Sequence, residues 1–190
     1  MAILRAMDDT TVATALAEID RRHGTDPEGG EQEYARRMTA TLDALVPDAS
    51  AELRIAVRAQ HFERWTTPRN AYPEGRRGYL AWRRDAAEVQ ARKIVALLGD
   101  LKFSKPFAAR VEALMLKSGL KRDPEVQTLE DCACLVFLEF QFADFKTGRD
   151  RAQLINIVRR TWAKMSTDAR CRALKLPLAE PDRKLIEEAL

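Results

Sequence analysis

The sequence predicts an all-α fold, a single compact multi-helix domain built around a buried central helix. One observation is the stretch from Leu129 to Lys146, LEDCACLVFLEFQFADFK, which contains no proline or glycine. On a helix its apolar residues cover nearly the whole circumference, and a helix that is apolar on all sides is normally buried. The other observation is that the rest of the chain places apolar residues at helical spacing between turn residues, with no alternating strand pattern.

Capping residues and apolar stripes define the first three expected helices. Asp9 or Thr10 can cap the first helix, and the turn-rich segment HGTDPEGG follows it. Val-Pro ends the second helix, and Asp48 or Ser50 can cap the third. The expected ranges are about 11–22, about 31–45 and about 51–65.

The later helices have similar boundary signals. Asp123, followed by proline and glutamate, is typical of a helix start that leads into the central helix. Thr128 with Asp131 three residues later resembles a capping box. Ser166 or Thr167 can cap a short final turn. We therefore expect seven or eight helices in all, the later ones over about 79–98, about 105–116, about 129–146 and about 151–164.

Length, charge and cysteine count limit the function classes. A chain of 190 residues is most simply one domain, here over 1–176, and prolines at 177 and 181 predict a loosely attached tail over 177–190. A net charge of +3 is too small to indicate nucleic acid by itself. The three cysteines form no paired zinc spacing, which favours core cysteines in a reducing cytoplasm. We find no signal peptide or membrane span and expect a cytoplasmic protein with no membrane partner.

Three carboxylates, Asp131, Glu139 and Asp144, interrupt the apolar central helix. A buried carboxylate costs several kcal/mol unless it is paired. Asp131 and Glu139 lie roughly 12 Å apart along a helix, so they should serve different partners. Asp131 can be an exposed cap near the helix start. We expect Glu139 to be buried and paired with an arginine or with His61.

Arginine and aromatic residues surround one histidine. His61 shares a sector of the third helix with Arg54, Arg58 and Trp65, and Arg64 lies on the other flank. The loop over 66–79, TTPRNAYPEGRRGY, adds more arginines, and long irregular loops in compact domains are often functional. Arginine forks suit carboxylate or phosphate groups. The pattern predicts an anion-binding pocket lined by Arg58, Arg64, Trp65, Arg69 and Tyr79.

In this interpretation His61 is an acid/base group that Asp131 or Glu139 orients, and the loop packs over it. A second interpretation stays open, in which the arginines pair with acids and His61 is a core histidine. His23, the other histidine, lies at a helix end, where it can act as a cap.

The segments QHFERW, TPRNAYP, RRGYLAWR and DPEVQTLEDCACLVFLE resemble a family catalogued as domain of unknown function 4202. The likeness runs from YARRM at Tyr34 to RRTWAKMS, which ends at Ser166. This resemblance implies little about activity, because the family is uncharacterised.

A weaker resemblance is to HD-domain phosphohydrolases, which are all-α and bind metal through His and Asp ligands. RAQHFERW is similar to their His-Asp helix, with Phe62 at the Asp position, and LEDCACL places Asp131 at the last ligand. Glu33 or Tyr34 stands at the first His position. His61 and Asp131 alone do not supply the roughly six ligands of magnesium or manganese, so we expect no metal and no cofactor.

Two functions of different classes remain. One is an HD-like hydrolase that takes a small phosphorylated or carboxylated molecule at His61. The other is a non-enzymatic module whose arginine-rich loop binds an acidic protein, or RNA by phosphate contacts and stacking. The sequence identifies neither a substrate nor an oligomeric state.

Overall fold

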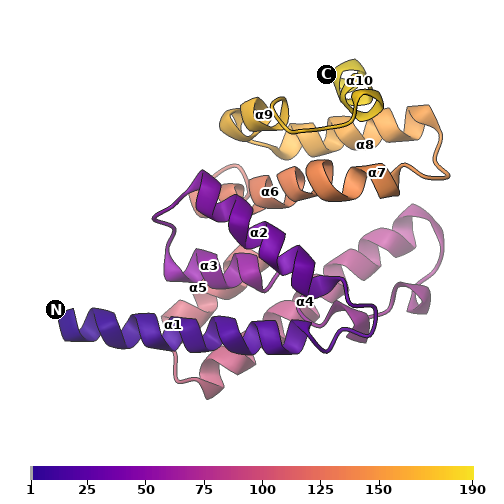
Figure 1. The fold of residues 1–190 in the computed structure, drawn as a ribbon. Helices are drawn as coiled ribbons and strands as arrows, with labels where there is room; N and C mark the ends of the chain where they lie inside the picture. The colour runs from indigo at the N-terminus through magenta and orange to yellow at the C-terminus, as the bar shows by residue number, and fades with distance from the viewer. Residues whose placement is uncertain (1) are drawn as a thin grey trace. The chain divides into compact units, whose positions relative to one another are not determined.

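The computed structural model describes the backbone of residues 2–190 and the side chains from residue 10 onward. The prediction of an all-α fold is confirmed, since this part of the chain forms helices and no strand (Figure 1). Contacts divide the chain into two compact units, Met1–Ser118 and Gly119–Leu190, where the sequence predicted one domain over 1–176. None of the described helices is both long enough and apolar enough to span a bilayer.

The first unit has a core to which α3 is central, because α3 contacts α1, α2 and α5. Helix α4 packs along α5. The buried interior includes Ile19, Met38, Leu42, Leu53, Ile55, Phe62, Ile94 and Leu98. The elements are α1 (Ala2–His23), α2 (Glu31–Leu45), α3 (Ala51–Arg58), the 3-10 turns η1 (Arg64–Thr66) and η2 (Arg69–Ala71), α4 (Gly75–Asp100) and α5 (Lys105–Met115).

Most predicted boundaries in this unit agree with the structure. Helix α2 has the predicted range, and Ser50 caps α3 by accepting a hydrogen bond from the Leu53 amide. Helix α1 begins at Ala2, so the start predicted at Asp9 or Thr10 is wrong and both residues lie inside the helix.

The third helix is shorter than predicted. It ends at Arg58 and not near Trp65, because His61 and Glu63 have positive φ angles of 64° and 49°. A left-handed residue cannot continue a right-handed helix. The residues after Arg58 therefore form turns, and these turns carry His61 and Arg64.

The loop predicted over 66–79 is shorter as well, because α4 starts at Gly75. Gly78 is buried on its first turn, and a Cβ atom there would lie 1.8 Å from the carbonyl oxygen of Pro73. The loop backbone thus lies directly against α4. Most of the loop side chains are exposed, Pro68 and Pro73 among them.

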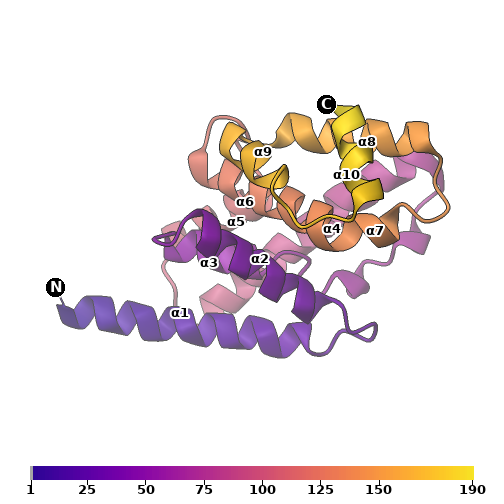
Figure 2. The ribbon, with the colours of Figure 1, turned by 45° about the horizontal axis from the view of Figure 1, so that its top comes forward.

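The second unit contains the predicted central helix as three consecutive elements. A π-helical segment, Phe137–Gln141, interrupts it between α6 and α7. Figures 1 and 2 show α8 beside α6, and α8 also contacts α10. The elements are α6 (Pro124–Val136), η3 (Phe137–Gln141), α7 (Phe142–Phe145), α8 (Arg151–Lys164), α9 (Thr167–Ala173) and α10 (Glu180–Ala189).

Helix starts in this unit confirm two predicted caps and correct a third. Asp123 caps α6, and Ser166 caps α9. The capping box predicted at Thr128 and Asp131 is absent, because both residues lie inside α6, where the Thr128 hydroxyl donates to the Pro124 carbonyl.

The chain end is not the loosely attached tail that was predicted. Residues 180–189 form α10, which packs on α8. Leu185 and Ile186 are buried, and the Lys146 ammonium pairs with the buried Asp182. Pro181 lies in the first turn of α10, where the missing N–H leaves no helical hydrogen bond unmade.

Candidate functional site

His61 lies in a strained turn directly after α3. Its φ of 64° is uncommon for a residue with a Cβ atom, and such conformations cost about 1–3 kcal/mol each. Glu63, two residues later, is left-handed as well. Backbone hydrogen bonds from Phe62 N to Ala59 O and from Arg64 N to His61 O hold the turn closed.

The first turn of α2 supplies two partners to the imidazole. Glu31 Oε2 lies 3.3 Å from His61 Nδ1, and the Tyr34 ring stacks on the imidazole with centroids 4.3 Å apart. The carboxylate of Asp26 fixes this end of α2 by accepting from the Gly30 and Glu31 amides. Glu31 was not among the predicted site residues.

Arg64 is the cation that the structure brings to His61. Its Nη1 atom lies 3.0 Å from Nε2 and 3.2 Å from Nδ1 of the imidazole. The guanidinium also lies over the Trp82 ring, 4.6 Å from the ring centroid. Trp82 in turn donates from Nε1 to the Thr67 carbonyl, 2.8 Å away, so the indole that supports Arg64 is itself held.

These surroundings keep the imidazole neutral at pH 7. Burial is the largest of the effects that lower the pKa of His61 to about 4, and the positive charges of Arg64 and Lys117 act in the same direction, against the raising effect of Glu31. Because 28% of the side chain stays exposed, the ring remains accessible to a ligand. A neutral imidazole beside a carboxylate can accept a proton, as a general base requires.

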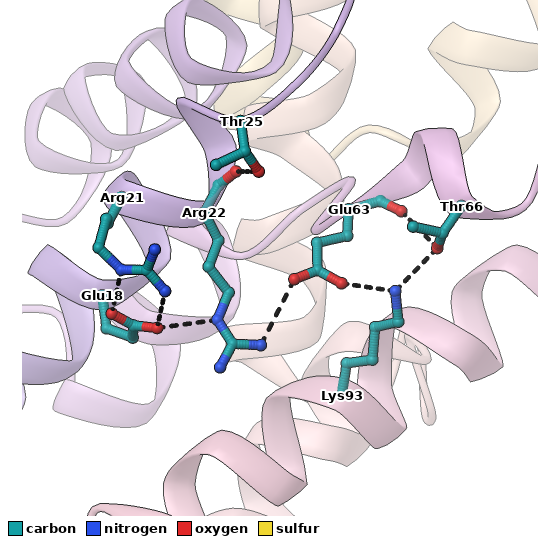
Figure 3. A network of polar contacts seen from close by, with 7 residues as sticks. All are labelled: Glu18, Arg21, Arg22, Thr25, Glu63, Thr66 and Lys93. Carbon is teal, nitrogen blue, oxygen red and sulfur yellow. Dashed lines mark hydrogen bonds and ion pairs between the residues drawn. The ribbon is translucent and has the colours of Figure 1, made fainter.

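An ion-pair network fixes the turn from its other side (Figure 3). The Glu63 carboxylate lies between Lys93 Nζ at 2.5 Å and Arg22 Nη1 at 3.4 Å. Lys93 also donates to the Thr66 hydroxyl. These contacts tie the turn between His61 and Arg64 to α1 and α4, and they lower the pKa of Glu63.

Two of the predicted anion-binding residues have structural partners. Arg58 donates to both carboxylate oxygens of Asp20, at 2.6 and 2.7 Å, and to the Thr39 hydroxyl. Arg69 donates to the carbonyls of Tyr72 and Pro73 and so holds the loop. The interpretation in which the arginines pair with acids therefore describes Arg58, whereas the partners of Arg69 are backbone carbonyls.

The remaining predicted aromatic residues lie closer to solvent. Tyr79 is 43% exposed, with its ring tilted against that of Trp82, and Trp65 is half-buried. His23 does not serve as an exposed helix cap. It is buried, and its Nε2 lies 3.0 Å from the Arg58 carbonyl.

The central-helix acids lie in the second unit, and their order of burial is the reverse of the prediction. Asp131 is 5% exposed, and its Oδ1 accepts from Gln127 Nε2 and from the Ser166 amide. Glu139, expected to be buried, is only half-buried and lies in the π-helical segment. Its pairing with His61 stays a prediction.

A second buried carboxylate was missed in the sequence. Glu130 is 3% exposed and lies 3.1 Å from Lys164 Nζ. On a helix the side chain of Glu130 points in a different direction from that of its neighbour Asp131. Apolar residues surround both positions in the sequence, so periodicity did not show that Glu130 is buried as well. Across the described residues, no three His, Cys, Asp or Glu side chains form a group that could hold a metal ion.

Comparison with known families places the chain. The family model described as "Domain of unknown function (DUF4202)" matches residues 13–186. The chain belongs to the DUF4202 family. Neither the curated proteins nor the solved structures include a match to this DUF4202 chain. The match spans both units, so His61 and Asp131 both lie within the family's own segment.

Proposed function

We propose that this DUF4202 chain binds a small phosphorylated or carboxylated molecule at His61 and Arg64, with the His61–Glu31 pair as an acid–base group for its hydrolysis. The observation that carries the proposal is the 3.3 Å contact between Glu31 and His61 Nδ1, with Arg64 at the same ring. A carboxylate on one nitrogen of a histidine orients the ring and sets its tautomer. Hydrolysis as the reaction class follows the resemblance to HD-domain hydrolases.

The proton positions follow from the partners. Glu31 accepts a hydrogen bond from Nδ1–H, which leaves Nε2 with its lone pair. In the ligand-free protein Arg64 lies against this nitrogen. An incoming anion competes for the Arg64 fork, and bidentate contacts between arginine and a phosphate or carboxylate are strong. Movement of Arg64 toward the anion frees Nε2 and removes a positive charge from the ring.

This sequence of events predicts that anion binding raises the pKa of His61. Imidazole signals in NMR, followed through pH with and without inorganic phosphate, measure it directly. We expect the His61 titration to move to higher pH with phosphate and the buried His23 titration to stay unchanged. In Arg64→Gln the pKa should already be higher without phosphate, and phosphate should have little further effect.

Arg92→Gln is the matched control, because Arg92 is an exposed arginine on α4 of the same unit. It removes the same charge and should behave as the unmodified protein. Identical His61 titrations with and without phosphate would contradict the proposal. A thermal-shift screen of phosphorylated and carboxylated metabolites, repeated with His61→Gln, then searches for the ligand, since a ligand that binds the folded state raises its stability.

One observation favours the interaction module as a second candidate. The first turns of α4 expose Arg76, Arg77 and Arg83 beside Tyr79 and Leu80, which are 43% and 51% exposed. Cations interleaved with an aromatic ring suit RNA. Salt separates the two candidates, because RNA binding weakens steeply with salt and a bidentate small-anion site is screened less.

A further inference from the structure

An open cleft of about 470 Å³ lies in the second unit, where the segment before α6 meets the start of α9. It uses no residue of the His61 site. Its volume falls within the range of about 300–1,000 Å³ that is usual for small-molecule sites. Among the side chains that line it are Lys121, Arg122, Gln127, Ser166, Thr167 and Arg170.

Two of the three cations in the cleft are held in place. Lys121 Nζ donates to the carbonyls of Lys164 and Met165, at 2.9 and 3.4 Å. Arg170 donates from Nε to the Trp162 carbonyl at 3.0 Å, and its guanidinium lies over the Trp162 ring. Lys121 thus uses two of its three N–H donors, and Arg170 uses its Nε–H. Within the part of the chain whose side chains are described, Nη1 and Nη2 of Arg170 have no hydrogen-bond partner and remain for a ligand.

Arg122 is the third cation and is exposed. Among the described residues its guanidinium makes no ion pair. The one acid in the lining, Asp123, already accepts from the amides of Glu125 and Val126 as the α6 cap. The backbone amides of Glu125 and Val126 at the start of α6 are already bound to Asp123. The attraction of the cleft for an anion therefore comes from the side chains of the cations.

The buried carboxylate of Asp131 holds two of the residues that line the cleft. Asp131 Oδ1 accepts from the Ser166 amide at 2.8 Å and from Gln127 Nε2 at 2.9 Å. Gln127 Nε2 also donates to the Lys164 carbonyl. Asp131 thus joins α6 to the residues between α8 and α9. Pre-organised donors need little reordering on binding, and this favours affinity.

We propose that this cleft binds the phosphate group of a small phosphomonoester. Three cations with two planar forks suit a dianion, and Arg forks match phosphate oxygens bidentately. The cleft is larger than one phosphate, so the rest of the ligand lies along Gln127, Ser166 and Thr167, which offer amide and hydroxyl groups. The ligand is therefore a polar metabolite, such as a sugar phosphate.

The test is a titration of the full chain with inorganic phosphate and with glucose 6-phosphate, followed by amide and side-chain NMR signals. We expect saturable shifts at Gln127, Ser166, Thr167 and Arg170, and tighter binding of the sugar phosphate. Arg122→Gln and Arg170→Gln should each weaken binding about tenfold, since one hydrogen bond between charged groups contributes free energy of that order. Arg122 is exposed, so its variant is expected to fold.

Arg172→Gln is the matched control, because Arg172 is an exposed arginine of α9 outside the cleft lining. It should bind as the unmodified protein does. Equal affinity of all three variants, or shifts spread evenly over the surface, would overturn the proposal. So would displacement of phosphate by a single-stranded RNA oligonucleotide that lacks terminal phosphates. His61→Gln should leave these shifts unchanged, so this site and the His61 site can fail independently.

Discussion

The carboxylate of Asp131 joins two elements of the second unit. One oxygen receives a backbone amide from the start of α9 and a side-chain amide from α6. An alanine at this position would remove the acceptor of the Ser166 N–H and one of the two acceptors of Gln127 Nε2. A buried polar group that loses its partner costs about 1–3 kcal/mol.

Asp131→Ala should therefore destabilise the protein by about 1–3 kcal/mol in urea unfolding, and Glu139→Ala by less than about 1 kcal/mol, because Glu139 is half-buried. Asp131→Asn keeps one acceptor oxygen and should fall between them. A loss below about 1 kcal/mol for Asp131→Ala would show that the carboxylate of Asp131 is dispensable.

Of the two charged partners of His61, the sequence predicted Arg64 as a site residue and missed Glu31. Arg64 was among the predicted anion-binding residues, although helical spacing placed it on the other flank of the third helix, and the turn after Arg58 brings it to the imidazole. Glu31 comes from a separate helix, and no local pattern connects it to residue 61. The positive φ of His61 was invisible as well, because such a turn normally signals itself by glycine.

At the scale of elements, the contact between Pro73 and Gly78 leaves no room for a larger side chain at position 78. A methyl group at position 78 would lie 1.8 Å from the Pro73 carbonyl oxygen, so the backbone would have to move. This is the segment that Arg69 holds through the Tyr72 and Pro73 carbonyls. Its shape depends on close approach of two backbones, for which only glycine has room.

Gly78→Ala should lower stability by more than about 1 kcal/mol, even though alanine normally favours a helix over glycine by about that amount. Gly99→Ala is the matched control, because Gly99 lies in the last turn of the same helix and a Cβ atom there would meet open space. It should be neutral or stabilising. Thermal unfolding of both variants measures the difference, and a stabilising Gly78→Ala would refute the close approach.

Helix caps and breakers explain why the ranges of α2 and α8 and the starts of α3 and α5 were predicted correctly. Ser50, Asp123 and Ser166 act as the sequence indicated. The π-helical segment over 137–141 was not predictable from propensity, since its residues form α-helix equally well. The wider π-helical turn rotates the residues that follow it about the helix axis. This rotation is one reason why the apolar residues of 129–146 cover the whole circumference when they are placed on an ideal α-helix.

For the whole molecule, the two histidines make stability depend on pH. Burial lowers the pKa of both His23 and His61 below the value of 6.5 expected in the unfolded chain. The unfolded state therefore takes up protons first as the pH falls. Their contribution to stability is complete above pH 6.5 and is lost as the pH falls from 6.5 toward 4, the folded pKa of His61.

Urea unfolding at several pH values between 7 and 5 should show stability falling with pH, by up to about 1.4 kcal/mol per pH unit for each histidine within the window. His61→Gln should reduce this slope, and the remaining slope belongs to His23. Most carboxylates titrate at lower pH, so they contribute little here. An unchanged slope in His61→Gln would contradict a neutral His61 in the folded state.

The stacking of Arg64 on Trp82 gives the His61 site an optical property. Indole emission depends on nearby charge, and the Arg64 guanidinium lies 4.6 Å from the Trp82 ring centroid. Only three tryptophans are present in the sequence. Replacing Trp65 and Trp162 with phenylalanine leaves Trp82 as the single emitter. Its fluorescence would then report, without any added dye, each departure of the guanidinium from the indole face.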